Sequence, residues 1–257
     1  MSDVPPPISD QPVLQLQDVA QRYGAASVLH GVTLQVRRGE IAAVLGAKGA
    51  GKTTLLQTIS GMQAPQAGSM VFKGENIVGV DPSQIVEQGL SHVAQGRSVF
   101  AHLSARDNLR MGAYTRTDHH GVTKDMDAMV RYFPVLRNCA DRPAGGLSAY
   151  LQLLLAVACA LMANPDLLLL DEPVHGLTPV QSAEFLDRLL QINRERGIAM
   201  LMTENGNGNG SHVLSIADYG YVLDKGHIAL EGTAATLREK IRFAALGTPG
   251  RRLHETM

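Results

Sequence analysis

A glycine-containing loop between two apolar segments constrains the fold more than any other feature of the chain. Residues 41–45 are apolar, residues 46–53 read GAKGAGKT, and residues 54–59 again contain several apolar side chains. This order predicts a strand, a loop and a helix. Glycines at the first, fourth and sixth loop positions allow backbone N–H groups to surround an anion, and the helix N-terminus adds the positive end of its dipole. The segment predicts a phosphate-binding loop, with these candidate nucleotide contacts: Gly46, Ala47, Lys48, Gly49, Ala50, Gly51, Lys52, Thr53 and Thr54.

Two side chains at the end of this loop have the chemistry that a nucleotide requires. Lys52 is placed to reach the outer phosphates as a cation, and the hydroxyl of Thr53 is placed to coordinate the magnesium ion that accompanies the nucleotide. The alternative is an ordinary glycine-rich turn that ends in Lys-Thr. The strand predicted before the loop and the helix predicted after it favour phosphate binding.

A second apolar segment ends in two carboxylates. Residues 167–170 are four leucines, and Asp171, Glu172 and Pro173 follow them. Enzymes with a phosphate-binding loop place an acid at the tip of a neighbouring strand to hold magnesium. Asp171 is the predicted metal ligand, and Glu172 is the predicted general base for an attacking water. Acidic residues end many parallel strands, so only the combination with the glycine loop predicts a site of phosphoryl transfer.

The composition bounds the class of protein. A chain of 257 residues fits a single α/β unit with a small appended subdomain, and a net charge of -1 gives no electrostatic reason to expect nucleic acid. Cys139 and Cys159 form no closely spaced pair, which favours a reducing compartment. The longest apolar stretch, residues 153–163, is shorter than the roughly 20 residues that a spanning helix needs. We expect a cytoplasmic chain that serves a membrane only by docking on an integral subunit.

Alternating polar and apolar residues near the start predict antiparallel strands, whereas strands and helices alternate later in the chain. The predicted fold class is α/β, with a mainly parallel sheet flanked by helices, an antiparallel β annex and a helical subdomain. The predicted strands cover residues 14–19, 28–36, 69–72, 90–93, 198–203, 219–223 and 227–230. The predicted helices cover residues 82–88, 104–114, 125–133, 148–162, 178–196 and 234–244, with a loop over residues 115–124.

This order of elements resembles the ATP-binding subunit of an ABC transporter from residue 14 to about residue 237. Four segments, at residues 95–100, 107–113, 160–165 and 220–223, are most similar to the ATPases of branched-chain amino acid importers and their urea-importer relatives. The resemblance implies a P-loop NTPase of ABC type over residues 12–245, with a helical subdomain at about residues 97–160. It also implies a disordered N-terminal tail over residues 1–11 and a C-terminal tail over residues 246–257.

The resemblance assigns roles to residues that the patterns alone leave open. Tyr23 would stack on adenine, although a packed edge residue is the simpler alternative, and Gln95 would touch magnesium and sense the membrane subunit. Ser148 would contact nucleotide across a head-to-tail dimer. The implied cofactors are ATP and Mg²⁺. The implied partners are integral membrane permease subunits, a second copy or a paralogous ATPase, and indirectly a solute-binding protein, at the cytoplasmic face of the inner membrane and without nucleic acid.

Several residues depart from the family pattern. In the signature segment, Ala149 and Tyr150 replace two glycines that allow close backbone approach to the partner's γ-phosphate. Asn205 occupies the catalytic switch position of a His or Gln, and Val174 and His175 replace a small polar start of the next segment. Two functions remain open. One is an ATP-hydrolysing subunit of an importer for branched-chain amino acids or a similar solute, and the other is a regulatory half of a mixed ATPase dimer with impaired hydrolysis.

Overall fold

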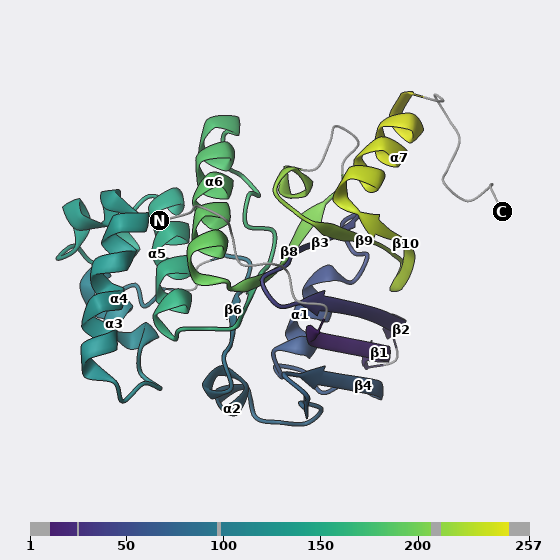
Figure 1. Cartoon of the computed structure of the whole chain (residues 1–257), viewed down its shortest axis with the longest axis horizontal. Coiled ribbons are helices and arrows are strands. Elements are labelled where there is room, and N and C mark those ends of the chain that lie inside the picture. The colour runs from purple at the N-terminus through teal and green to yellow at the C-terminus, as the bar shows by residue number, and fades with distance from the viewer. Residues whose placement is uncertain (1–10, 25, 97–98, 207–211, 247–257) are drawn as a thin grey trace.

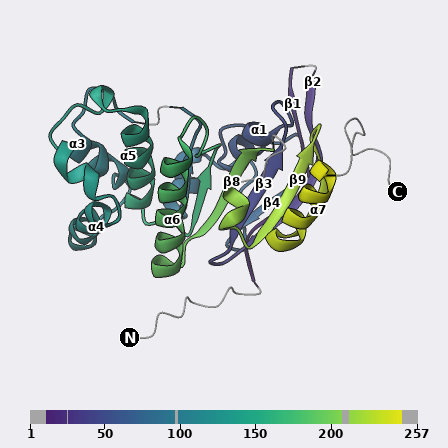
Figure 2. The same ribbon diagram turned by 90° about the horizontal axis from the view of Figure 1, so that it is seen from above.

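The computed structural model describes residues 11–24, 26–96, 99–206 and 212–246. Helices cover one face of a central sheet, and a second sheet with a short helix covers the other face (Figures 1 and 2). A group of helices, α3, α4 and α5, extends away from the sheets (Figure 1). None of the helices in the described residues is both long enough and apolar enough to span a bilayer.

The central sheet has six strands in the order β10-β9-β3-β8-β7-β6. All neighbours are parallel except β9 and β10, which form an antiparallel hairpin at one edge. The six strands are β3 (Ile41–Gly46), β6 (Leu90–Val93), β7 (Leu167–Leu170), β8 (Ala199–Asn205), β9 (Tyr219–Asp224) and β10 (His227–Thr233). Because these central strands run parallel, their carboxyl ends meet at one edge of the sheet.

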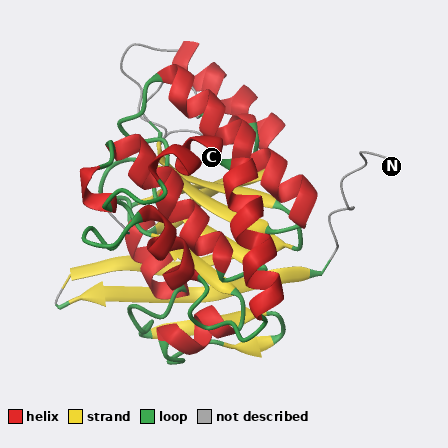
Figure 3. Ribbon diagram, turned by 90° about the vertical axis from the view of Figure 1, so that its left-hand side faces the viewer, coloured by secondary structure: helices red, strands yellow, loops and turns green. Residues whose placement is uncertain are grey.

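The second sheet is antiparallel and has the strand order β2-β1-β4-β5. Its strands are β1 (Pro12–Tyr23), β2 (Ala26–Arg37), β4 (Ala67–Phe72) and β5 (Glu75–Asn76). Alternate residues of β1 and β2 are buried, as in a sheet with one face on the core and one in solvent. This sheet is the antiparallel annex that the early alternation predicted, and Figure 3 shows its long strands running across the lower part of the molecule.

The helices follow the strands in an α/β order. They are α1 (Lys52–Ile59), α2 (Pro82–Glu87), α3 (Ala105–Gly112), α4 (His119–Tyr132), α5 (Ala149–Met162), α6 (Pro179–Arg196) and α7 (Ala234–Leu246), with 3₁₀ turns at Pro134–Cys139, Ala144–Gly146 and Val213–Ser215. Ser104, Ser148 and Thr178 cap three of these helices through their side chains. The predicted α/β class with an annex and a helical subdomain agrees with this arrangement.

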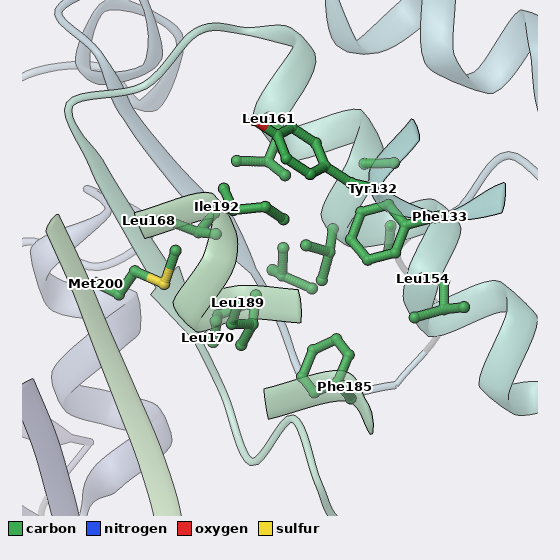
Figure 4. Packing of buried hydrophobic residues seen from close by; sticks show 14 of the residues in the cluster. Tyr132, Phe133, Leu154, Leu161, Leu168, Leu170, Phe185, Leu189, Ile192 and Met200 are labelled. Carbon is green, nitrogen blue, oxygen red and sulfur yellow. The ribbon is translucent and has the colours of Figure 1, made fainter. Parts of the chain in front are cut away.

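The sheet separates two hydrophobic clusters. On β3, Ala43 and Leu45 face the cluster of α5 and α6, whereas Ala42 and Val44 face α1 and the antiparallel sheet. Figure 4 shows the first cluster, in which side chains of α4, α5 and α6 pack against β7 and β8. The labelled members include Tyr132, Phe133, Leu154, Leu161, Leu168, Leu170, Phe185, Leu189, Ile192 and Met200. Since apolar residues cover both faces, β3 and β7 are buried throughout.

The prediction of a loop over residues 115–124 is wrong in its second half, because α4 begins at His119. Arg116 forms ion pairs with Asp118 and Asp125, and Asp125 also pairs with Arg196 of α6. Asp125 lies in the first turns of α4, so these ion pairs hold the start of the helix against Arg116, which precedes it, and Arg196 of α6. The first strand is also longer than predicted and runs through Tyr23. The predicted tails fall almost entirely outside the described residues.

The two cysteines have no disulfide partner and lie against the first cluster. Burial raises the pKa of the Cys159 thiol to about 12, and burial also raises the pKa of Cys139. Both thiols therefore stay protonated at neutral pH, a state in which cysteine is a poor nucleophile and metal ligand.

Candidate functional site

The glycine loop joins the carboxyl end of β3 to the start of α1. Gly49 and Gly51 adopt left-handed backbone conformations, with φ of 83° and 109°, and Gly51 is the N-cap of α1. A side chain at Gly46 would lie 2.4 Å from the carbonyl oxygen of Leu223 on β9. The loop therefore needs glycine for backbone conformation at two positions and for space at the third.

The turn between β9 and β10 contacts the glycine loop through backbone hydrogen bonds. The backbone N–H of Gly226 donates to the carbonyl of Ala50 at 2.9 Å, and its carbonyl accepts from the backbone N–H of His30 at 2.9 Å. A Cβ atom at Gly226 would lie 2.1 Å from the carbonyl oxygen of Val28. The turn thus connects the glycine loop to β2 through a contact that only glycine allows.

We expect Gly226→Ala to weaken nucleotide binding and to lower stability. The substituted residue must leave its left-handed conformation or displace Val28, and it loses the contact with Ala50 in either case. Strain of this kind costs on the order of 1–3 kcal/mol. Denaturant unfolding and nucleotide titration measure the two effects, and Gly74→Ala, at a left-handed glycine with open space around it, is the matched control. Equal behaviour of the two variants would contradict a role for the turn.

Parallel pairing brings the acidic strand end and Asn205 to the loop. Gly46 at the end of β3 lies opposite Asn205 at the end of β8, and Leu170 of β7 lies opposite Met202 of β8. The backbone N–H of Glu172 donates to the Thr203 hydroxyl at 2.9 Å. The predicted juxtaposition of the glycine loop with the acidic strand end is present in the structure.

The ammonium group of Lys52 lies at the centre of this arrangement and is almost fully buried. It donates to the carbonyl oxygens of Gly46 and Ala47 at 2.9 and 3.0 Å, and to Asn205 Oδ1 at 2.8 Å. It also forms an ion pair with Glu172, with 3.2 Å between Nζ and Oε1. The lysine side chain is 3% exposed and the glutamate side chain 10% exposed, so this pair is screened little by solvent.

The carboxylate of Glu172 is surrounded by donors. Beside the Lys52 contact at Oε1, its Oε2 accepts from Asn205 Nδ2 at 2.7 Å and from Gln95 Nε2 at 3.1 Å. Glu172 has a φ of 47°, which is unusual for a residue with a side chain. Asn205 therefore uses both ends of its amide, one on the lysine and one on the carboxylate.

Asp171 lies behind this cluster and is 4% exposed. Its Oδ1 accepts from the Thr203 hydroxyl at 2.7 Å, whereas its Oδ2 is buried and accepts no hydrogen bond from the described residues. A buried carboxylate oxygen without a partner is costly unless another group satisfies it. The free oxygen fits a magnesium ion held directly or through water, together with the oxygen atoms of Thr53 and Gln95.

An open cavity of about 440 Å³ lies over the loop. Predicted residues make up most of its lining, namely Lys48, Gly49, Gly51, Lys52, Thr53, Thr54, Gln95, Glu172 and Asn205. Val28 and His175 also line it and were not predicted as site residues. The presence of His175 in the loop that follows Asp171 and Glu172 was a signal for including it, because that loop leaves the same sheet edge.

Five other predicted residues are not in the cavity lining, and the side chain of Tyr23 lies outside the described part of the structure. Gly46, Ala47 and Ala50 contribute the backbone contacts described above, and Asp171 lies behind Glu172. Tyr23 is the last residue of β1. Ser148 is exposed and caps α5 by accepting from the backbone N–H of Leu151.

Tyr150, which replaces a glycine of the family pattern, is partly buried against the first cluster. Burial and hydrogen bonding to Glu184 of α6 raise the pKa of its phenol. The side chain is thus accommodated against α6.

Comparison with protein families decides the assignment. The model of the ABC transporter family matches residues 29–175, more than half of the chain. The chain belongs to the ABC transporter family. As a member of this family, it is an ATP-binding subunit with ATPase activity.

Curated relatives match most of the chain. The chain is 38% identical over 237 residues to the high-affinity branched-chain amino acid transport ATP-binding protein BraG of Pseudomonas aeruginosa, covering 91% of this chain and 100% of the relative. It is 34% identical to the probable branched-chain amino acid transport ATP-binding protein LivF of Archaeoglobus fulgidus, covering 87% of this chain and 93% of the relative.

Solved structures share the fold. An ATP-binding cassette of an ABC transporter in its ADP conformation aligns with a TM-score of 0.79 at 23% identity, covering 92% of this chain and 96% of the other. The structure of cbiO1 from Clostridium perfringens, part of an ABC transporter complex, aligns with a TM-score of 0.80 at 24% identity, covering 92% and 95%. These likenesses support the predicted P-loop fold of ABC type.

Proposed function

We propose that this chain binds ATP with magnesium in the cavity over the glycine loop and energises a membrane importer for branched-chain amino acids. One observation carries the assignment of the site: a buried ammonium group, a carboxylate and two amides converge beside the cavity over the glycine loop at the sheet edge. The identity to two branched-chain amino acid transport ATP-binding proteins supports the solute class. The same sequence identity does not favour the alternative function, a regulatory subunit with impaired hydrolysis.

The residues at the cavity have different roles in the proposed hydrolysis. Lys52 exchanges its contacts with Glu172 and the loop carbonyls for phosphate oxygens, and backbone N–H groups of the glycine loop surround the same phosphates. Release from Lys52 leaves the Glu172 carboxylate free to accept a proton from water, with Asn205 and Gln95 holding its orientation. Magnesium, held by Thr53, Gln95 and Asp171, would neutralise charge on the phosphates.

The partners follow from this role. The described residues include no membrane-spanning helix, so the proposed importer needs separate integral permease subunits. The chain would lie on the cytoplasmic face of the membrane, as one half of an ATPase dimer with a second copy or a paralogue. A solute-binding protein would contribute indirectly by delivering the solute.

Reconstitution tests the proposal. The chain is expressed with its candidate permease subunits, the complex is inserted in proteoliposomes, and uptake of radiolabelled leucine is followed with ATP enclosed on the side of this chain. We expect uptake that requires ATP and magnesium and that unlabelled isoleucine or valine suppresses. Uptake that unlabelled urea suppresses instead would contradict the solute class but not the ATPase assignment.

A further inference from the structure

The cavity has an imidazole whose role the proposed mechanism does not use. His175 is exposed in the loop after β7 and lines the cavity together with Lys52, Gln95 and Glu172. Its backbone N–H donates to the carbonyl of Glu172 at 3.0 Å, which fixes the tight turn that carries it. The imidazole makes no hydrogen bond with the described part of the chain, so both ring nitrogens are available to a ligand.

The two amides at this end of the cavity each direct a donor at Glu172. Asn205 bonds Lys52 through Oδ1 and Glu172 through Nδ2, and Gln95 donates to Glu172. The carboxylate of Glu172 would repel a phosphate oxygen. Among the groups in the lining that can donate a hydrogen bond to an anion, His175 is therefore one whose ring donor has no partner among the described residues.

We infer that His175 donates an imidazole N–H to the terminal phosphate group of the nucleotide bound in its own chain. This inference rests on the proposed binding of ATP in the cavity. Imidazole suits the task because it can donate when neutral and donates more strongly when protonated. The contact supplies a donor beside the Asn205 amide, whose Nδ2 already donates to Glu172 and whose Oδ1 can only accept.

The inference predicts different effects on the affinities for two nucleotides, one with a terminal phosphate group and one without it. We expect His175→Ala to weaken binding of magnesium AMP-PNP by about ten- to a hundredfold, the range of one hydrogen bond to a charged group, and to leave ADP affinity nearly unchanged. His175→Gln, which keeps an N–H donor on a side chain of similar reach, should recover part of the AMP-PNP affinity. Isothermal titration at protein concentrations where the chain is monomeric measures these affinities.

Two controls keep the result specific. His119→Ala removes another exposed imidazole, at the first turn of α4 and outside the cavity lining, and should change neither affinity. Thermal unfolding should be the same for all three variants, since both histidines are exposed.

Distinct outcomes overturn distinct claims. Equal weakening of AMP-PNP and ADP, or no weakening of either, would overturn the contact with the terminal phosphate. Weakening that appears only in dimers would overturn a contact within one chain. Failure of the unmodified chain to bind either nucleotide would overturn the proposed function as well, whereas normal binding with an inert His175 would leave it intact.

Discussion

Glu172→Gln is expected to reduce ATP hydrolysis by about a hundredfold or more while leaving ATP binding intact, because a positioned general base contributes roughly 10²–10⁴ to a rate. The substitution keeps the shape of the side chain and its capacity to accept from Asn205 and Gln95. It removes the negative charge that pairs with Lys52 at 3.2 Å. The freed ammonium should bind phosphate at least as tightly as before. The rate of ATP hydrolysis should therefore fall while the affinity for ATP stays the same or rises.

Steady-state phosphate release and nucleotide titration measure the two quantities on the same protein. Glu87→Gln, on the exposed end of α2, makes the same chemical change away from the cavity and should alter neither. If the unmodified chain already hydrolyses ATP as slowly as Glu172→Gln, the carboxylate does not act as the base. The chain would then behave as the regulatory half of a mixed dimer.

The approach of the glycine loop to the acidic strand end could be predicted from the sequence. Both motifs follow apolar segments too short for helices, and parallel strands place their carboxyl ends at one edge. The Lys52–Glu172 contact is therefore a consequence of local patterns combined with one rule of sheet topology. The left-handed conformations of Gly49 and Gly51 were likewise implied by the spacing of glycines in the loop.

The role of Asn205 could not be predicted in the same way. From the sequence, Asn205 is a short amide at a position where the family has a longer side chain. The structure places it opposite Gly46 in the parallel pair of β3 and β8, which lie far apart in the sequence. This register lets one amide reach both Lys52 and Glu172, an outcome that depends on the tertiary arrangement of three strands.

The start of α4 illustrates a different limit. His119 and His120 with a following glycine suggest a polar loop, and no apolar period marks a helix there. The structure shows that Arg116 joins Asp118 to Asp125 and that Asp125 also meets Arg196. An ion pair with a residue of another helix, such as that between Asp125 and Arg196, leaves little trace in the local sequence.

Lys52→Ala is expected to abolish stabilisation by nucleotide and to destabilise the protein even without nucleotide. The ammonium group joins the carbonyls of Gly46 and Ala47 to Asn205 and Glu172. Removing one partner of a buried ion pair leaves the other charge uncompensated, at a cost of about 3–5 kcal/mol. The unfolding midpoint in denaturant should fall accordingly in buffer free of nucleotide and magnesium.

Nucleotide separates the two effects of this substitution. A ligand at a hundred times its dissociation constant stabilises a folded protein by about 2.7 kcal/mol. We expect magnesium ATP to give the unmodified chain a shift of this kind and to give Lys52→Ala none. Lys48→Ala removes an exposed ammonium from the same loop and should leave stability without nucleotide unchanged. If Lys52→Ala were as stable as Lys48→Ala without nucleotide, the ion pair with Glu172 would not hold the resting loop. If magnesium ATP still stabilised it fully, the phosphates would bind elsewhere.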